Sequence, residues 1–286
     1  MRIQSMSEHA GCITWWSLGA ETDPDGLLHR FDKLGLPKYA PEQRTWLMSL
    51  KAALTDQFPG KMIRPLKRRE KNGYSVVEEI KGERENNFPA LGSATITDEG
   101  EVIVRSGDFD RQALQDKANH YRRVLPASSV SAVMIEIINS VLGGIAMREG
   151  GGIYFVPENM TGKWMNIAKA VEESACNGVS NSVTICPMET NAMTLRDIRD
   201  AIVREVETEA AAIRKELADN DLGDRAIQNR VDRSGNLFNR MKQYEGLLGE
   251  TLAACRDALR PTLQALQAAK AEREADQVFE DLYEVA

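Results

Sequence analysis

The sequence has few of the side chains that build metal and redox sites. It contains four cysteines and three histidines in 286 residues, and no two cysteines form a C-x-x-C pair or stand beside a histidine. Structural zinc sites and thiol redox motifs depend on such spacing. We therefore expect reduced thiols, no metal and no cofactor.

Long apolar runs are missing as well. The longest, Val130 to Leu142, contains Glu136 and Asn139 and is shorter than the roughly 20 residues that a transmembrane helix needs. The first residues show no basic segment followed by an apolar run, which a signal peptide would require. We expect a cytoplasmic protein that has no membrane segment.

The charge balance excludes a generally basic surface. The chain has 36 basic and 43 acidic residues, and its net charge is −7. Such a balance keeps a protein soluble and disfavours attraction of its whole surface to nucleic acid or anionic lipid. A nucleic-acid-binding role would therefore need a local basic patch.

Sequence signatures of catalysis are also absent. No G-x-S-x-G motif occurs, and the run Gly150-Gly151-Gly152 has the spacing of neither common phosphate-binding loop. A hairpin turn explains these glycines better. We predict no catalytic residue and favour a protein that is not an enzyme, although a hydrolase site built from distant carboxylates stays an open alternative.

Residues 1–107 are predicted to form an α+β domain. A bulky run from Gly11 to Leu18 indicates a strand, and helices are expected near 25–34 and 41–58. Alternating and β-branched residues from Met62 to Arg105 indicate several strands. A glycine-containing turn between Ile96 and Val102 predicts a hairpin.

Residues 108–190 are predicted to form a second unit. Two helices, from 108 or 110 to 125 and from about 128 to 142, should precede a hairpin whose turn is Gly150-Gly151-Gly152. A helix over 158–176 and a strand over 182–186 should follow. The first two helices and the hairpin could imitate a winged helix, but the second helix is apolar on most sides, which favours a place in the core.

Residues 191–286 carry the clearest pattern, with apolar residues every three or four positions. The pattern predicts helices over 194–219 and 224–259, joined by a short turn and therefore antiparallel. At 1.5 Å per residue they would be roughly 40 and 50 Å long. Pro261 should kink or restart the chain before a final helix. The predicted fold class is thus an α+β N-terminal region followed by a long, coiled-coil-like antiparallel helical hairpin.

The apolar stripe of this hairpin suggests a function. If the hairpin leaves the stripe exposed, burying it would drive association. We therefore predict a non-enzymatic scaffold or interaction protein, encoded by a phage or mobile element, that forms a homo-oligomer or docks a protein partner. The predicted interface residues are Ile198, Ile202, Val206, Ile213, Leu217, Ile227, Val231, Phe238, Met241 and Leu248.

A basic segment supports the alternative function, that of a nucleic-acid-binding accessory factor, with DNA as a possible partner. Clustered lysines and arginines commonly contact phosphates. The same residues could instead be a solvated edge strand and loop, where positive charge discourages pairing between sheet edges. The segment contains Lys61, Arg64, Lys67, Arg68, Arg69 and Lys71.

Three short motifs resemble an uncharacterised family found in bacteria, archaea and phages. They are Trp15-Trp16-Ser17-Leu18, Leu34-Gly35-Leu36-Pro37, and the run Gly151-Gly152-Ile153-Tyr154-Phe155-Val156-Pro157 ahead of the paired helices. The family's basic and aromatic early helix is replaced here by residues 43–47. The resemblance implies no activity, and its aromatic elements suit a core better than an active site.

Overall fold

The computed structural model describes residues 9–66, 72–80, 87–218, 223–249 and 252–284. These residues form two four-stranded sheets and eight α-helices. The chain divides into two compact units, both discontinuous in sequence. The first unit takes residues 1–16, 135–165 and 183–286, and the second takes 17–134 and 166–182. The boundaries at 107 and 190 expected from the sequence stay a prediction.

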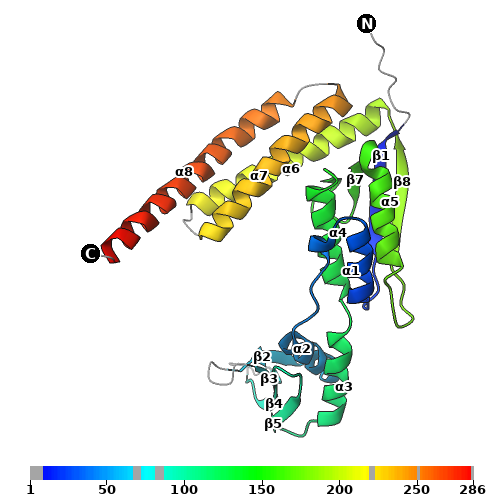
Figure 1. The fold of residues 1–286 in the computed structure, drawn as a ribbon, viewed down its shortest axis with the longest axis vertical. Coiled ribbons are helices and arrows are strands. Elements are labelled where there is room, and N and C mark those ends of the chain that lie inside the picture. The colour runs from blue at the N-terminus through cyan, green and yellow to red at the C-terminus, as the bar shows by residue number, and fades with distance from the viewer. Residues whose placement is uncertain (1–8, 67–71, 81–86, 219–222, 250–251, 285–286) are drawn as a thin grey trace. The chain divides into compact units, whose positions relative to one another are not determined.

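The first unit contains a sheet with the strand order β6-β7-β1-β8. Its strands are β1 (His9–Ser17), β6 (Ile145–Ala146), β7 (Tyr154–Pro157) and β8 (Ser182–Glu189) (Figure 1). β6 and β7 pair antiparallel, which confirms the predicted hairpin, and β7 also pairs antiparallel with β1. The turn between β6 and β7 contains Gly150, Gly151 and Gly152, all at positive φ. The local sequence therefore decides the hairpin, because glycine adopts this conformation without strain.

Three long helices complete the first unit, and they correct the predicted fold class. α6 (Ala192–Ala218), α7 (Asp224–Leu248) and α8 (Ala253–Glu284) lie side by side, and each contacts the other two (Figure 1). The protein is therefore a mixed α/β protein with helices throughout the described chain. The prediction of a two-helix, coiled-coil-like hairpin was wrong, because a third helix covers the pair.

The predicted helix over 224–259 was wrong for a local reason. α7 ends at Leu248, and Gly249 follows at φ 67°, donating its N–H to the carbonyl of Glu245. A left-handed glycine after the last helical residue is a common helix stop. The predicted restart of the chain at Pro261 was also wrong, since Pro261 is an exposed residue within α8, whereas a kink there stays a prediction. Its missing N–H removes one helical hydrogen bond without ending the helix.

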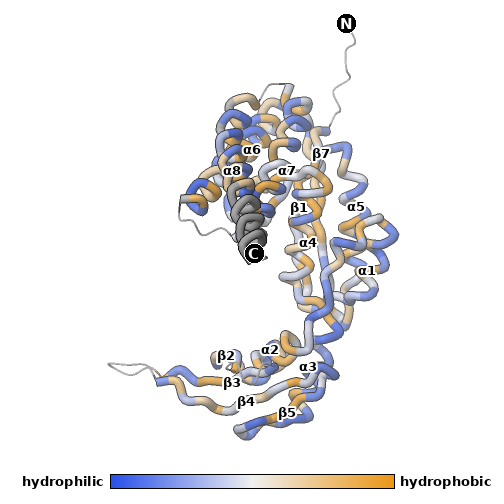
Figure 2. The backbone as a smooth tube through the Cα atoms, turned by 60° about the vertical axis from the view of Figure 1, so that its left-hand side comes forward, coloured by the Kyte–Doolittle hydropathy of each residue, from blue (hydrophilic) through white to orange (hydrophobic). Residues whose placement is uncertain are grey.

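The core of the first unit joins the sheet to the three helices. Apolar positions, orange in Figure 2, recur along these helices between hydrophilic ones. Phe155 of β7, Ile202 of α6 and Met241 of α7 are each at most 1% exposed, and Leu259 of α8 lies in the same cluster. None of the helices in the described part of the chain is long and apolar enough to cross a membrane.

The second unit is built on a meander of four antiparallel strands. β2 (Met62–Pro65), β3 (Gly73–Val77), β4 (Ala90–Ile96) and β5 (Val102–Ser106) lie in this order in the sheet. α2 (Trp46–Gln57) and α3 (Arg111–Arg122) pack against the sheet. Thr45 and Asp110 cap these helices by accepting hydrogen bonds from Met48 N and Ala113 N. Polar caps of this type satisfy N–H groups that a helix start leaves unpaired.

Further helices precede and follow this meander. α1 (Pro24–Lys33) begins after its N-cap Asp23, and the short 3-10 helix η1 (Pro37–Tyr39) follows it. α4 (Ala127–Ser140) and α5 (Glu158–Glu172) each contribute residues to both units. The predicted helices and strands before residue 190 are therefore confirmed as elements, with shifted ends.

Candidate nucleic-acid interface and the predicted sites

The basic segment predicted from the sequence begins on the first strand of the second unit's sheet. Lys61 precedes β2 and pairs with the carboxylate of Glu78, whereas Arg64 is exposed on β2. The guanidinium carbon of Arg64 lies 4.8 Å from the centre of the Phe88 ring. Lys67, Arg68, Arg69 and Lys71 lie outside the described residues. In sequence, these four stand between the end of β2 and the start of β3.

The strand register places Arg64 at one end of a polar row. Arg64 pairs with Ser75, Ser75 with Ser93, and Ser93 with Ser106. Residues paired directly across antiparallel strands project from the same face of a sheet. The hydroxyl groups of Ser93 and Ser106 lie 2.9 Å apart. One arginine and three serines therefore cross all four strands on a single face.

A second arginine lies on this face beside the row. Arg105 Nε donates a hydrogen bond of 3.1 Å to Thr95 Oγ1. The register shifts between Ser93 and Ala94, and Arg105 is the extra residue opposite this shift. Such bulges redirect a side chain, and here the bulged residue is the arginine that contacts Thr95. We call the face that carries Arg64, Ser75, Ser93, Thr95, Arg105 and Ser106 the hydroxyl face.

The opposite face of the sheet is apolar and covered by helices. Val76, Ala94 and Val102 belong to one buried cluster with Leu50 of α2 and Leu114 of α3. Both helices therefore use the same side of the sheet. The hydroxyl face is left free of α2 and α3, because alternation along a strand sends its polar residues to the other side.

Exposed apolar side chains accompany the arginines. Phe88 is 39% exposed beside Arg64, and Met62 is 38% exposed. Arg64 Nη2 also approaches the sulfur of Met62 at 3.9 Å. An arginine over a partly exposed aromatic ring presents both a positive charge and a flat apolar surface. This combination can contact a phosphate and a stacked base at the same time.

The predicted interface residues of α6 and α7 lie in the core. Six of them are at most 2% exposed, and the other four are partly buried against the same clusters. The structure therefore brings these residues together but covers them with the first unit's own strands and α8. The buried six are Ile198, Ile202, Val206, Ile213, Ile227 and Met241. The partly buried four are Leu217, Val231, Phe238 and Leu248.

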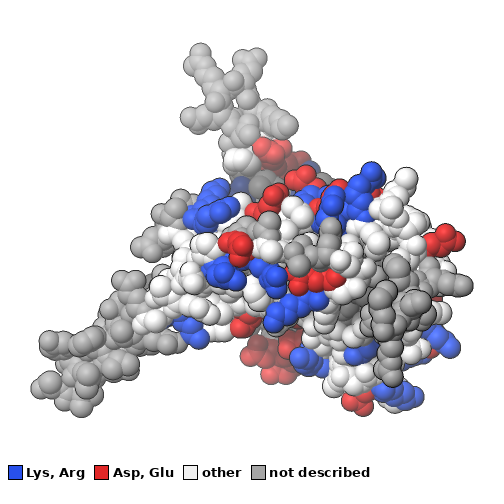
Figure 3. Space-filling view, turned by 90° about the horizontal axis from the view of Figure 1, so that it is seen from above, with Lys and Arg blue, Asp and Glu red and all other residues white. Residues whose placement is uncertain are grey.

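The charged side chains on the exposed side of α6 also do not form a patch of one sign. Arg196 pairs with Asp197, and Arg199 pairs with Asp200. On the face drawn in Figure 3, basic and acidic side chains are mixed. The predicted coiled coil and helical hairpin are wrong because α8 and the β-strands pack against α6 and α7. The predicted phage origin, homo-oligomer and DNA binding gain no support from this face.

The histidines and cysteines do not form a reactive site. His120 Nε2 lies 2.9 Å from Glu21 Oε1, and Asn177 donates a hydrogen bond of 2.7 Å to Glu21 Oε2. These contacts, Asn177 first, lower the pKa of Glu21. Cys176 lines the same hollow as His120, but burial and then Glu21 raise the pKa of its thiol. A raised pKa opposes a nucleophilic thiolate, and no cluster of three metal-binding side chains occurs among the described residues.

Sequence reasoning missed a buried polar network in the first unit. Arg240 of α7 is 8% exposed and donates hydrogen bonds of 2.6 Å to Gly144 O and Glu205 Oε1. Tyr244, one turn later, donates to Gly143 O at 2.8 Å. Burial raises the pKa of Tyr244, so the phenol stays neutral. The available signal for this network was that Arg240 and Tyr244 fall on the apolar side of the α7 pattern.

The comparisons place the chain in a family whose role is not known. Residues 10–276 match the model of a family of unknown function, DUF6744. No curated protein and no solved structure matches the chain. The resemblance to an uncharacterised family is therefore confirmed, whereas its spread over bacteria, archaea and phages stays a prediction. Because the match covers most of its length, the chain belongs to the DUF6744 family.

Proposed function

We propose that this protein binds single-stranded nucleic acid through the hydroxyl face of its second unit. The observation that carries the proposal is the row from Arg64 to Ser106 on the face opposite α2 and α3. The guanidinium groups of Arg64 and Arg105 can donate hydrogen bonds to phosphate and sugar oxygens. The hydrogen bond between Ser93 and Ser106 leaves one hydroxyl proton for the same use, whereas the Ser75 hydroxyl already donates to Gly92 O. Phe88 adds a surface on which a base can stack, whatever its sequence.

Local charge favours this face over the rest of an acidic chain. Arg64 and Arg105 are exposed there. In the sequence alone, the residues between β2 and β3 include four basic residues and one glutamate, which lie outside the described residues. Lys61 contributes little, because Glu78 neutralises it. A single strand suits this sheet better than a duplex, since its unpaired bases can lie flat against Phe88.

The scaffold function predicted first stays untested, but the apolar stripe offered in its support is not exposed. It required an apolar stripe that association would bury, and the structure covers the central stripe residues Ile202, Val206 and Met241 within the first unit. Burial already achieved within one chain offers no further driving force for a partner.

Fluorescence anisotropy with labelled oligo(U) and oligo(dT) tests the proposal. We expect binding at low salt that weakens as salt rises, because bound phosphates release counterions. Arg64→Gln and Arg105→Gln should each make the slope of log affinity against log salt shallower by about 0.7. Phe88→Ala should cost about 1–3 kcal/mol if one base stacks on the ring.

Arg196→Gln is the matched control. Arg196 has a side chain that is 59% exposed and lies on α6 in the first unit. This substitution removes the same charge from a helix that belongs to the other unit. Equal losses for Arg196→Gln and Arg64→Gln would show that net charge alone acts, and would refute the proposed site. Absence of binding by the wild type at low salt would refute the function itself.

A further inference from the structure

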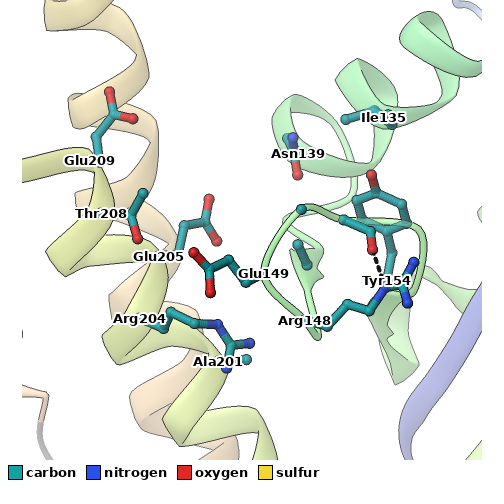
Figure 4. A pocket seen from close by; sticks show the side chains of 13 residues that line it. Ile135, Asn139, Arg148, Glu149, Tyr154, Ala201, Arg204, Glu205, Thr208 and Glu209 are labelled. Carbon is teal, nitrogen blue, oxygen red and sulfur yellow. Dashed lines mark hydrogen bonds between the residues drawn. The ribbon is translucent and has the colours of Figure 1, made fainter. Parts of the chain in front are cut away.

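A separate cavity of about 300 Å³ lies in the first unit (Figure 4). It lies between α4, the turn from β6 to β7, and α6. This volume is at the lower end of the range for small-molecule sites. Side chains from all three segments point toward the gap in Figure 4, among them Asn139, Glu149, Tyr154 and Glu205.

The hydroxyl group of Tyr154 has no hydrogen-bond partner among the described residues, although Tyr154 is only 5% exposed. Its ring stacks on Trp16, with ring centres 5.2 Å apart and planes 7° apart. The stacking fixes the ring, and the phenol lies at the cavity. The hydroxyl oxygen is not one of the fully buried side-chain atoms that lack a partner, so it stays accessible from the cavity that Tyr154 lines. A ligand in the cavity could supply the missing partner.

Gly151 leaves space next to the Tyr154 hydroxyl because it has no side chain. A Cβ atom at Gly151 would lie 2.7 Å from Tyr154 Oη. Gly151 also has φ +75°, which strains residues that carry a side chain. Glycine at this position therefore leaves room at the phenol. The three-glycine turn thus shapes the cavity as well as closing the hairpin.

The cavity presents charges of both signs. Arg204 donates one hydrogen bond of 2.9 Å to Met147 O, and Arg148 Nε donates to Gly151 O at 2.5 Å. A guanidinium has five N–H donors, so each arginine keeps further donors. Glu149 forms no hydrogen bond or ion pair within the described residues. Glu205 Oε2 is buried without a partner.

We propose that this cavity binds a small zwitterion of the α-amino acid class. The ligand carboxylate would take the free donors of Arg148 and Arg204, and its ammonium group would face Glu149 and Glu205. The Tyr154 hydroxyl completes the polar contacts. A ligand with a single charge would leave the opposite set of charges without a partner, which is costly in a partly buried site.

Thermal denaturation of the full chain with each free proteinogenic amino acid tests this proposal. We expect at least one amino acid to raise the melting temperature in a saturable manner, because a ligand that binds only the folded state stabilises it. Its N-acetyl derivative and its amide should fail, since each lacks one of the two charges. Success of either derivative, or no shift with any amino acid, would overturn the proposal.

Two variants locate the ligand. Tyr154→Phe keeps the stacked ring and should weaken binding by about 2- to 10-fold, the effect of one lost hydrogen bond. Glu149 lies on the exposed turn. Glu149→Gln should weaken binding by about 10-fold or more, because the ligand ammonium group loses its contact with a carboxylate. Tyr39→Phe, in the second unit, is the control and should leave affinity unchanged. Unaltered affinity in both cavity variants would overturn the site.

Discussion

Replacement of Arg240 by methionine tests how strongly the buried network holds the first unit. Arg240 joins α7 to Gly144 and to α6 through Glu205, with both donor–acceptor distances at 2.6 Å. Methionine keeps much of the apolar side chain but removes both donors. Glu205 would then lose its arginine, and its second oxygen already has no partner.

The expected loss is large because the remaining groups stay in a dry environment. Breaking a buried ion pair by removing one partner costs about 3–5 kcal/mol. The Glu205 side chain is 21% exposed, so water can relieve part of this cost. We therefore expect Arg240→Met to lower the free energy of unfolding by about 3 kcal/mol, at the lower end of that range.

Chemical denaturation followed by tryptophan fluorescence measures this loss. Trp15, Trp16 and Trp164 belong to the first unit, and Trp46 to the second. A Trp46→Phe background therefore restricts the signal to the first unit. The double variant Arg240→Met with Glu205→Leu should recover at least about 1 kcal/mol relative to additivity, because neither charge is then left alone. Additive losses, or a loss below 1 kcal/mol for Arg240→Met, would refute the reasoning.

Three further predictions concern stability. Gly11→Ala should prevent the pairing of β1 with β7, because the added Cβ would lie 2.1 Å from Val156 O and φ is +153°. Limited proteolysis should then show that the first unit is unfolded, and a native-like cleavage pattern would contradict this prediction. Thr14→Val should lower the free energy of unfolding by about 1–3 kcal/mol, since Trp164 Nε1 would lose its 3.0 Å hydrogen bond to Thr14 Oγ1. Thermal unfolding measures this loss, and Thr55→Val, which removes an exposed hydroxyl on α2, is the control. The pKa of Glu21 in the folded protein lies below its ordinary value of 4.5. Ionised Glu21 therefore stabilises the folded state above pH 4.5, and this stabilisation is lost as the pH falls through the folded-state pKa. Glu21→Gln should therefore reduce the difference in stability between neutral pH and pH 3, and an unchanged difference would contradict this role.

Several elements follow from local chemistry and could be predicted. The three-glycine turn produces the β6–β7 hairpin, because consecutive residues at positive φ favour glycine. Asp110 starts α3 by capping Ala113 N, as a polar residue before a helical pattern suggests. The basic segment likewise located Arg64, an exposed residue of the candidate interface. Its partners Ser75, Ser93 and Ser106 could not be identified, since strand register depends on which strands pair.

Other features depend on contacts between distant segments. Gly249 gave a local signal for the end of α7, but the continuing apolar pattern through Leu259 hid it. The cavity could not be predicted, because Asn139, Tyr154 and Arg204 come from separate parts of the chain. The same holds for Arg240, whose partners stand 35 and 96 residues away in sequence.

The sequence by itself determined which faces of α6 and α7 are apolar, where the main turns fall and that acidic charge dominates. Only the tertiary structure decided that α8 and the β-strands cover those faces, and that α2 and α3 leave one side of a sheet to arginines and serines. The physical reason is that periodicity reports the direction of apolar side chains along an element. The partner that buries them is chosen by the packing of the whole unit, where distant segments compete for the same surface.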